Sequence, residues 1–160
     1  MCPLLSQGRS APGRQYQLYA RTQMTISVII PVLNGSKFIR ECLEAVFSSE
    51  YHDYECILVD DGSTDGTQEI ARKYDITVKQ LVDGPYGPAY ARNQGAELAS
   101  GEILFFVDAD VVIKADTLSR IANSFEKHPS YSAVFGSYDE FPNEGGFISQ
   151  YKNLFHHYRQ

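Results

Sequence analysis

"TISVIIPVL", residues 25–33, is a predominantly apolar run rich in β-branched side chains. Its length suits a strand, and the lack of polar alternation is typical of a strand covered on both faces. The turn signal Asn34-Gly35 comes next, and apolar residues then recur at helical spacing over residues 38–47. The stretch therefore predicts a buried parallel strand followed by a helix, the repeating unit of an α/β protein.

The same unit recurs along the rest of the chain. Further strands are predicted within residues 54–65, 76–82, 102–110 and 131–138. Helices are predicted between them: a short one with capping-box spacing at Asp65 and Gln68, one from about Pro88, and one within 114–129. Short links between alternating strands and helices predict a mostly parallel, Rossmann-like sheet with flanking helices.

The composition suits one globular domain. The chain has 160 residues, of which 43% are hydrophobic and 21% charged, and its net charge is -6. This balance and the lack of a basic run argue against a nucleic-acid binder. No apolar run approaches the ~20 residues of a membrane span. We expect a cytoplasmic protein, with peripheral attachment to a membrane as an alternative.

Residues 1–23 differ in composition from the rest of the chain. They hold three arginines, no acid, two prolines and two glycines, without a sustained apolar stretch. They lack the apolar core of a secretory signal peptide. We expect a disordered N-terminal extension over residues 1–23 and one domain over residues 24–160.

Polar side chains gather where the predicted strands end. Asn34 follows the first strand, Asp60 and Asp61 the second, and Asp108 and Asp110 the fourth. The carboxyl ends of parallel strands share one edge of the sheet, where ligands of such sheets bind. A carboxylate is costly in a dry interior, so these groups must face water or a cation. If the chain stays extended, Asp108 and Asp110 project to the same side and form a cradle for a hard divalent cation.

Four segments together resemble the family 2 glycosyltransferases. They are "SVIIPVLN" (27–34), "ILVDDGSTDGT" (57–67), "ARNQGAELASGEILFFVDAD" (91–110) and "KADTL" (114–118). They follow the family's order, and the resemblance runs from about Thr25 to the last residue. It implies a GT-A fold and a nucleotide-diphospho-sugar donor, with a UDP-sugar expected. The implied reaction transfers the sugar to a glycan or a lipid-linked acceptor.

The resemblance also implies a donor site at the edge where the acids gather. The residues implied to contact the nucleotide are Pro31, Asn34, Asp60 or Asp61, Arg92 and Asp108. Asp110 matches the carboxylate that binds Mg²⁺ or Mn²⁺ on the diphosphate, and Asp108 is a second candidate ligand. Such a metal neutralises the charge on the departing nucleoside diphosphate. Asp65, by contrast, is interpreted as a helix cap.

The chain departs from the family pattern near its end. The family's catalytic base and acceptor region follow the fifth strand and the next helix. Asp139 and Glu140 come too early to match that base, so no catalytic residue is assigned and we expect donor binding with little transfer. The domain is expected to be incomplete at its C-terminus. The stripe of Phe147, Tyr151, Leu154, Phe155 and Tyr158 is expected to pack on the sheet, meet a missing segment or promote self-association.

Other functions remain open at this point. A non-catalytic nucleotide-sugar-binding module or inactive fragment would keep the same donor site. A sugar-phosphate nucleotidyltransferase would need a Gly-rich basic loop after the first strand, where "NGSKF" (34–38) offers one Gly and one Lys. A receiver domain also clusters acids at strand ends. A P-loop NTPase is excluded because its G-x-x-x-x-G-K-[ST] motif is absent.

Overall fold

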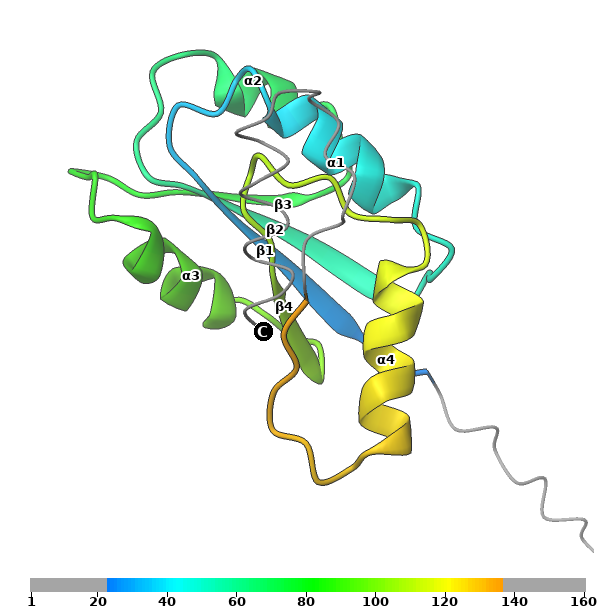
Figure 1. Ribbon diagram of the computed structural model, residues 1–160. Helices are drawn as coiled ribbons and strands as arrows, with labels where there is room; N and C mark the ends of the chain where they lie inside the picture. Colours follow the sequence, from blue (N-terminus) through cyan, green and yellow to red (C-terminus); the bar gives the residue numbers. More distant parts are fainter. Residues whose placement is uncertain (1–22, 137–160) are drawn as a thin grey trace, which may run out of the picture.

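The computed structural model describes residues 23–136, and the structural statements below concern that part of the chain. Its elements in chain order are β1 (Ile26–Val32), α1 (Ile39–Phe47), β2 (Tyr54–Asp60), α2 (Thr67–Ala71), β3 (Thr77–Gln80), α3 (Pro88–Ala96), β4 (Ile103–Phe106) and α4 (Thr117–Lys127). The strands form one parallel sheet in the order β3-β2-β1-β4 (Figure 1). The predicted parallel α/β architecture is confirmed.

The central strand, β1, explains the apolar run in the sequence. Ile26 pairs with Tyr54 of β2 on one side and with Ile103 of β4 on the other. Every residue of β1 is buried. A strand with neighbours on both edges and helices on both faces meets no water, so it shows no polar alternation.

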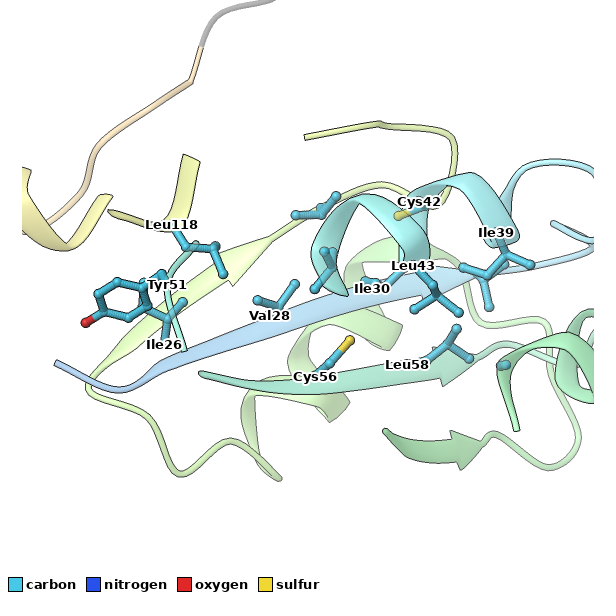
Figure 2. Packing of buried hydrophobic residues seen from close by; sticks show 14 of the residues in the cluster. Ile26, Val28, Ile30, Ile39, Cys42, Leu43, Tyr51, Cys56, Leu58 and Leu118 are labelled. Carbon is cyan, nitrogen blue, oxygen red and sulfur yellow. The ribbon is translucent and has the colours of Figure 1, made fainter. Parts of the chain in front are cut away.

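Helices cover both faces of the sheet. On one face, α1, α2 and α4 pack on alternate β1 and β2 residues, including Val28, Ile30 and Leu58 (Figure 2). On the other face lies α3 (Figure 1), and its Ala91 packs with Ile57 and Val59. Each fully buried Ile or Leu contributes about 1.5–3 kcal/mol.

Close packing of α3 depends on a glycine. A Cβ added to Gly95 would lie 2.4 Å from Cγ2 of Ile29 and 3.2 Å from Cγ2 of Val59. Without a side chain at this position, the helix backbone can approach β1 and β2. The start of α3 lies at the carboxyl ends of the strands, where the N–H of Gly87 donates to Asp61.

At the amino ends of the strands, Glu55 forms hydrogen bonds to the link between α3 and β4. Its Oε1 accepts hydrogen bonds from Oγ of Ser27 at 2.6 Å and from the backbone N–H groups of Ser100 and Gly101 at 2.6 and 3.2 Å. Burial opposes ionisation of Glu55, but these hydrogen bonds prevail and lower its pKa. The network fixes the point where the chain enters β4.

The strand order defines where a ligand can bind. The chain runs from β1 through β2 to β3 in one direction and then returns to place β4 on the other side of β1. The two crossovers through α1 and α2 lie on one face, and the crossover through α3 lies on the other. In open parallel sheets, ligands bind where the strand order reverses, outside the carboxyl ends of the strands. Here that point lies between β1 and β4.

Two predictions about elements are wrong. Residues 131–136 form no strand, although a fifth strand was predicted over residues 131–138. Their side chains are exposed, and none of these residues joins the ladder of β4. The capping box at Asp65 and Gln68 does not form either, because α2 begins at Thr67 with Gly66 as its N-cap.

Several expectations fall on residues outside the described part of the chain. These are the disordered extension predicted over residues 1–23, of which only residue 23 is described, the acids at 139 and 140, and the aromatic stripe at 147–158. The domain limits at 24–160 therefore stay a prediction. None of the helices found within residues 23–136 is long and apolar enough to cross a membrane.

Candidate functional site

The acidic motif after β4 lies in a turn. The N–H of Val107 still donates to the carbonyl of Ile29 on β1, at 3.0 Å. The N–H of Val111 then donates to the carbonyl of Asp108, at 3.0 Å, which closes a turn over residues 108–111. The expectation of an extended chain through Asp108 and Asp110 is corrected by this turn. Both acids are exposed at the carboxyl end of the sheet.

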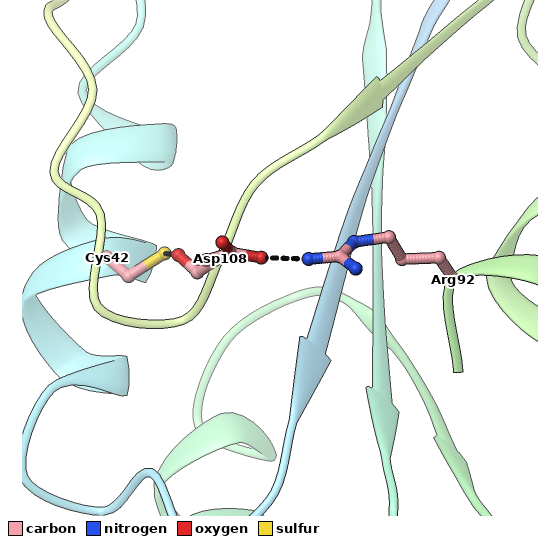
Figure 3. Close-up of polar contacts among 3 residues, drawn as sticks. All are labelled: Cys42, Arg92 and Asp108. Carbon is pink, nitrogen blue, oxygen red and sulfur yellow. Dashed lines mark hydrogen bonds and ion pairs between the residues drawn. The ribbon is translucent and has the colours of Figure 1, made fainter. Parts of the chain in front are cut away.

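Arg92 on α3 reaches across the end of β1 to this turn. Its guanidinium forms an ion pair with Oδ1 of Asp108 (Figure 3). The side chains of Arg92 and Asp108 are 33% and 54% exposed, so both charges stay partly hydrated. The structure thus brings together two residues that the sequence placed in the donor site. It also gives Asp108 a cationic partner, whereas Asp110 is not part of this ion pair.

Cys42 of α1 also contacts the turn. Its Sγ donates to the carbonyl of Asp108 at 3.7 Å (Figure 3). Burial of the thiol and then the negative charges of Asp110 and Asp108 raise the pKa of Cys42 to about 12. The thiol therefore stays protonated at neutral pH and acts as a neutral hydrogen-bond donor to the backbone of the acidic motif.

The two acids that end β2 are both buried and hydrogen-bonded. Asp60 is 0% exposed and accepts from the N–H of Ser63 at 2.9 Å and from Nε2 of Gln68. Asp61 is 3% exposed and accepts from the N–H groups of Tyr86 and Gly87 at 2.8 and 2.7 Å. Each carboxylate thus shapes a loop at the edge of the site. A nucleobase contact through either acid stays a prediction.

The loop between β1 and α1 has its amide donors already paired. The N–H groups of Asn34, Gly35 and Ser36 donate to side chains of Ser63, Thr67 and Asp65 at 2.8, 2.9 and 2.9 Å. These acceptors lie between the end of β2 and the first residue of α2. A phosphate bound at this place would need free amides. The loop is therefore no phosphate cradle, which removes the main support for a nucleotidyltransferase.

Two further predicted site residues lie at the end of β1. Pro31 is buried within the strand, opposite Val59 of β2. Asn34 is exposed, has a φ of 53°, and accepts from the N–H of Thr64 at 2.9 Å through Oδ1. Asparagine tolerates this left-handed conformation better than most residues. Both residues lie near the reversal point between β1 and β4, and a nucleotide contact through either stays a prediction.

The carboxylates of the turn suit a hard divalent cation. Carboxylate oxygens are the ligands that Mg²⁺ and Mn²⁺ prefer, and Mg²⁺ commonly uses only one or two of them beside substrate phosphates and water. No group of three or more potential metal ligands exists among residues 23–136. The residues present fit a metal that a diphosphate ligand would help to hold. Asp110 would be the first ligand, because Asp108 already pairs with Arg92.

Sequence reasoning missed the residues that support the site. Neither Cys42 nor the hydroxyls in "GSTDGT" (62–67) were predicted as site residues. Their partners lie far away in the chain, with 66 positions between Cys42 and Asp108 and 32 between Gly35 and Thr67. The only available signal was topological, because loops after adjacent parallel strands must meet at one edge.

The parallel sheet, its flanking helices and its reversal point define an α/β domain of the GT-A type. The chain matches the model of the family "Glycosyl transferase family 2" over residues 27–160. It therefore belongs to glycosyltransferase family 2, as the sequence motifs indicated.

Known proteins agree with this assignment. Glycosyltransferase GlyG of Streptococcus pneumoniae serotype 4 is 33% identical over 125 residues, which are 76% of this chain and 41% of that protein. A crystal structure of Staphylococcus aureus TarS in complex with UDP-GlcNAc superposes with a TM-score of 0.64 at 32% identity, covering 71% of this chain and 38% of the other. A mannosyltransferase from Pyrobaculum calidifontis, in complex with GDP-Man and Mn²⁺, gives 0.61 at 28% identity, covering 84% and 39%. The chain spans less than half the length of these three relatives.

Proposed function

We propose that this chain binds the nucleotide part of a sugar donor at the carboxyl edge between β1 and β4. The observation that carries the proposal is the exposed Asp108–Asp110 turn. Arg92 forms an ion pair with the carboxylate of Asp108, and Cys42 donates a hydrogen bond to the carbonyl of Asp108. Asp108, Asp110 and the guanidinium of Arg92 are partly exposed to water. Such a set suits a diphosphate that binds together with a divalent cation.

In this proposal, each group has a separate task. Asp110 would hold Mg²⁺ or Mn²⁺, and the metal would supply positive charge to offset that of the leaving nucleoside diphosphate. Asp108 stays oriented by Arg92 and faces the ribose side of the donor. Pro31, Asn34 and the loops shaped by Asp60 and Asp61 form the wall of the nucleoside pocket.

We propose a UDP-sugar as the donor and a glycan or lipid-linked sugar as the acceptor. Support for UDP comes from the TarS complex with UDP-GlcNAc, which is 32% identical to this chain. The GDP-Man and Mn²⁺ complex of the mannosyltransferase supports the metal and makes GDP the nucleotide to compare. Cytoplasmic action at or near a membrane is part of the same proposal, because nucleotide sugars are its substrates.

Calorimetry of the purified full chain tests the proposal. UDP and GDP are titrated separately, once with Mn²⁺ and once with EDTA. We expect binding of UDP with Mn²⁺ and a loss of at least about tenfold in EDTA, as for a ligand held through its cation. Equal affinity in EDTA would remove the metal from the proposal, and lack of binding to both nucleotides would overturn it.

A further inference from the structure

Asp65 and Thr67 link the two loops that follow β1 and β2. Thr67 is 0% exposed, and its Oγ1 accepts from the N–H of Gly35 at 2.9 Å. The same hydroxyl donates to Oδ1 of Asp65, while Oδ2 of Asp65 accepts from the N–H of Ser36 at 2.9 Å. We call this pair, Asp65 and Thr67, the loop clamp.

The loop clamp depends on the charge of Asp65. The hydroxyl of Thr67 is the main cause of a lowered pKa for Asp65, and the hydrogen bonds from Ser36 lower it further. The carboxylate is thus ionised over the physiological pH range and remains an acceptor for both partners. A hydrogen bond to an ionised acceptor is about twice as strong as one between neutral groups.

The clamped loop lies beside the acidic turn. A Cβ added to Gly35 would lie 3.8 Å from Cβ of Ala109, the residue between Asp108 and Asp110. The loop also carries Asn34, which has a left-handed backbone and accepts a hydrogen bond from the N–H of Thr64 through its side chain. The position of residues 34–36 therefore affects both the pocket wall and the turn.

We propose that Asp65 and Thr67 are positioning residues for donor binding: they do not touch the nucleotide but hold residues 34–36 in the shape that the pocket and the acidic turn require. This inference rests on the proposed donor binding and adds residues that act on it through the backbone. A preformed loop spares the ligand the cost of ordering it, so loss of the loop clamp weakens binding without removing any ligand contact.

A matched pair of variants at Thr67 tests the hydroxyl. Thr67→Ser keeps the hydroxyl, whereas Thr67→Val replaces it with a methyl group of similar size. We expect Thr67→Val to raise the Kd for UDP with Mn²⁺ about tenfold, and Thr67→Ser to stay within about twofold. Because Thr67 is buried and Val could impair folding, Asp65→Ala at an exposed position provides an independent test, also with about a tenfold loss. Asp75→Ala, an exposed acid away from the loops, serves as the control with unchanged Kd.

Amide hydrogen exchange provides a measurement that does not depend on the donor. We expect the amides of Gly35 and Ser36 to exchange faster in Asp65→Ala and Thr67→Val than in the wild type and in Thr67→Ser, while amides of β1 keep their protection. Wild-type exchange or wild-type Kd in both variants overturns the inference. Lack of UDP and GDP binding by the wild type would instead overturn the proposed function, and exchange would still decide whether the loop clamp holds the loop.

Discussion

Arg92 and Asp108 form an ion pair that joins two elements from opposite sides of the central strand. Arg92 belongs to α3, which covers one face of the sheet, and Asp108 follows β4, whose neighbour is β1. The pair fixes the side chain of Asp108 while Asp110, two residues further on, is not part of the pair. Two acids of one short motif therefore have different surroundings and, we infer, different tasks.

Replacing Arg92 with Lys should weaken donor binding more than it affects folding. Lysine keeps the positive charge but loses the planar fork that orients a carboxylate. We expect the Kd for UDP with Mn²⁺ to rise about tenfold, while the free energy of unfolding changes by less than about 1 kcal/mol because the pair is partly hydrated. Calorimetry and urea denaturation measure the two quantities. Arg120→Ala, on the exposed side of α4, is the control. An unchanged Kd for Arg92→Lys would contradict the role of the ion pair.

Replacing Asp110 with Ala should abolish the effect of the metal on donor binding. The side chain is exposed and serves no core contact, so we expect the melting temperature to stay close to that of the wild type. The affinity for UDP should become about the same with Mn²⁺ and with EDTA. Asp116→Ala, an exposed acid at the start of α4, should retain the difference. Unfolding of Asp110→Ala would show that this carboxylate is structural.

Replacing Glu55 with Gln should change how stability depends on pH. Hydrogen bonds lower the pKa of Glu55 below its ordinary 4.5 in the folded protein, despite burial. A lowered folded-state pKa contributes stability above the unfolded pKa, and this contribution is lost as pH falls through the folded pKa. The wild type should therefore exceed Glu55→Gln most near neutral pH, and the gap should narrow below pH 4.5. Urea denaturation at several pH values measures it, and a gap that is constant or widens on acidification would contradict the prediction.

Replacing Gly95 with Ala should destabilise the protein, although Ala favours helices. The added Cβ would meet Cγ2 of Ile29 at 2.4 Å, so α3 must move away from β1. Overpacking of this kind costs about 1–3 kcal/mol, against about 1 kcal/mol gained in helix propensity. Urea denaturation should show a net loss, whereas Asn93→Ala on the exposed side of the same helix should cost nothing. A more stable Gly95→Ala would show that the contact with β1 is loose.

The sequence was sufficient for the central architecture because each buried strand carries its own signature. The strand β1 lies within the apolar run of residues 25–33, and α3 starts at Pro88, both as predicted. Residues 131–136 show the limit, since a short apolar stretch becomes a strand only when a neighbouring strand accepts its hydrogen bonds. That partner cannot be read from local residues.

The candidate site was predictable in its composition and not in its internal contacts. Asp108 and Asp110 were recognisable as strand-end acids, but the turn between them depends on one backbone hydrogen bond from Val111. The loop clamp joins Ser36 to Asp65 over 29 positions, and sequence periodicity carries no information on such a contact. Topology places the loops together, and side-chain geometry then decides the partners.

The paired amides of residues 34–36 have a consequence for anion selectivity. Many nucleotide-binding proteins hold phosphate by free backbone N–H groups, and inorganic phosphate or sulfate can compete for such a cradle. Here the three donors face Ser63, Thr67 and Asp65. Free phosphate finds no such cradle at these three amides, so under the proposed donor binding small anions should compete less at this loop than they do at a loop of free amides.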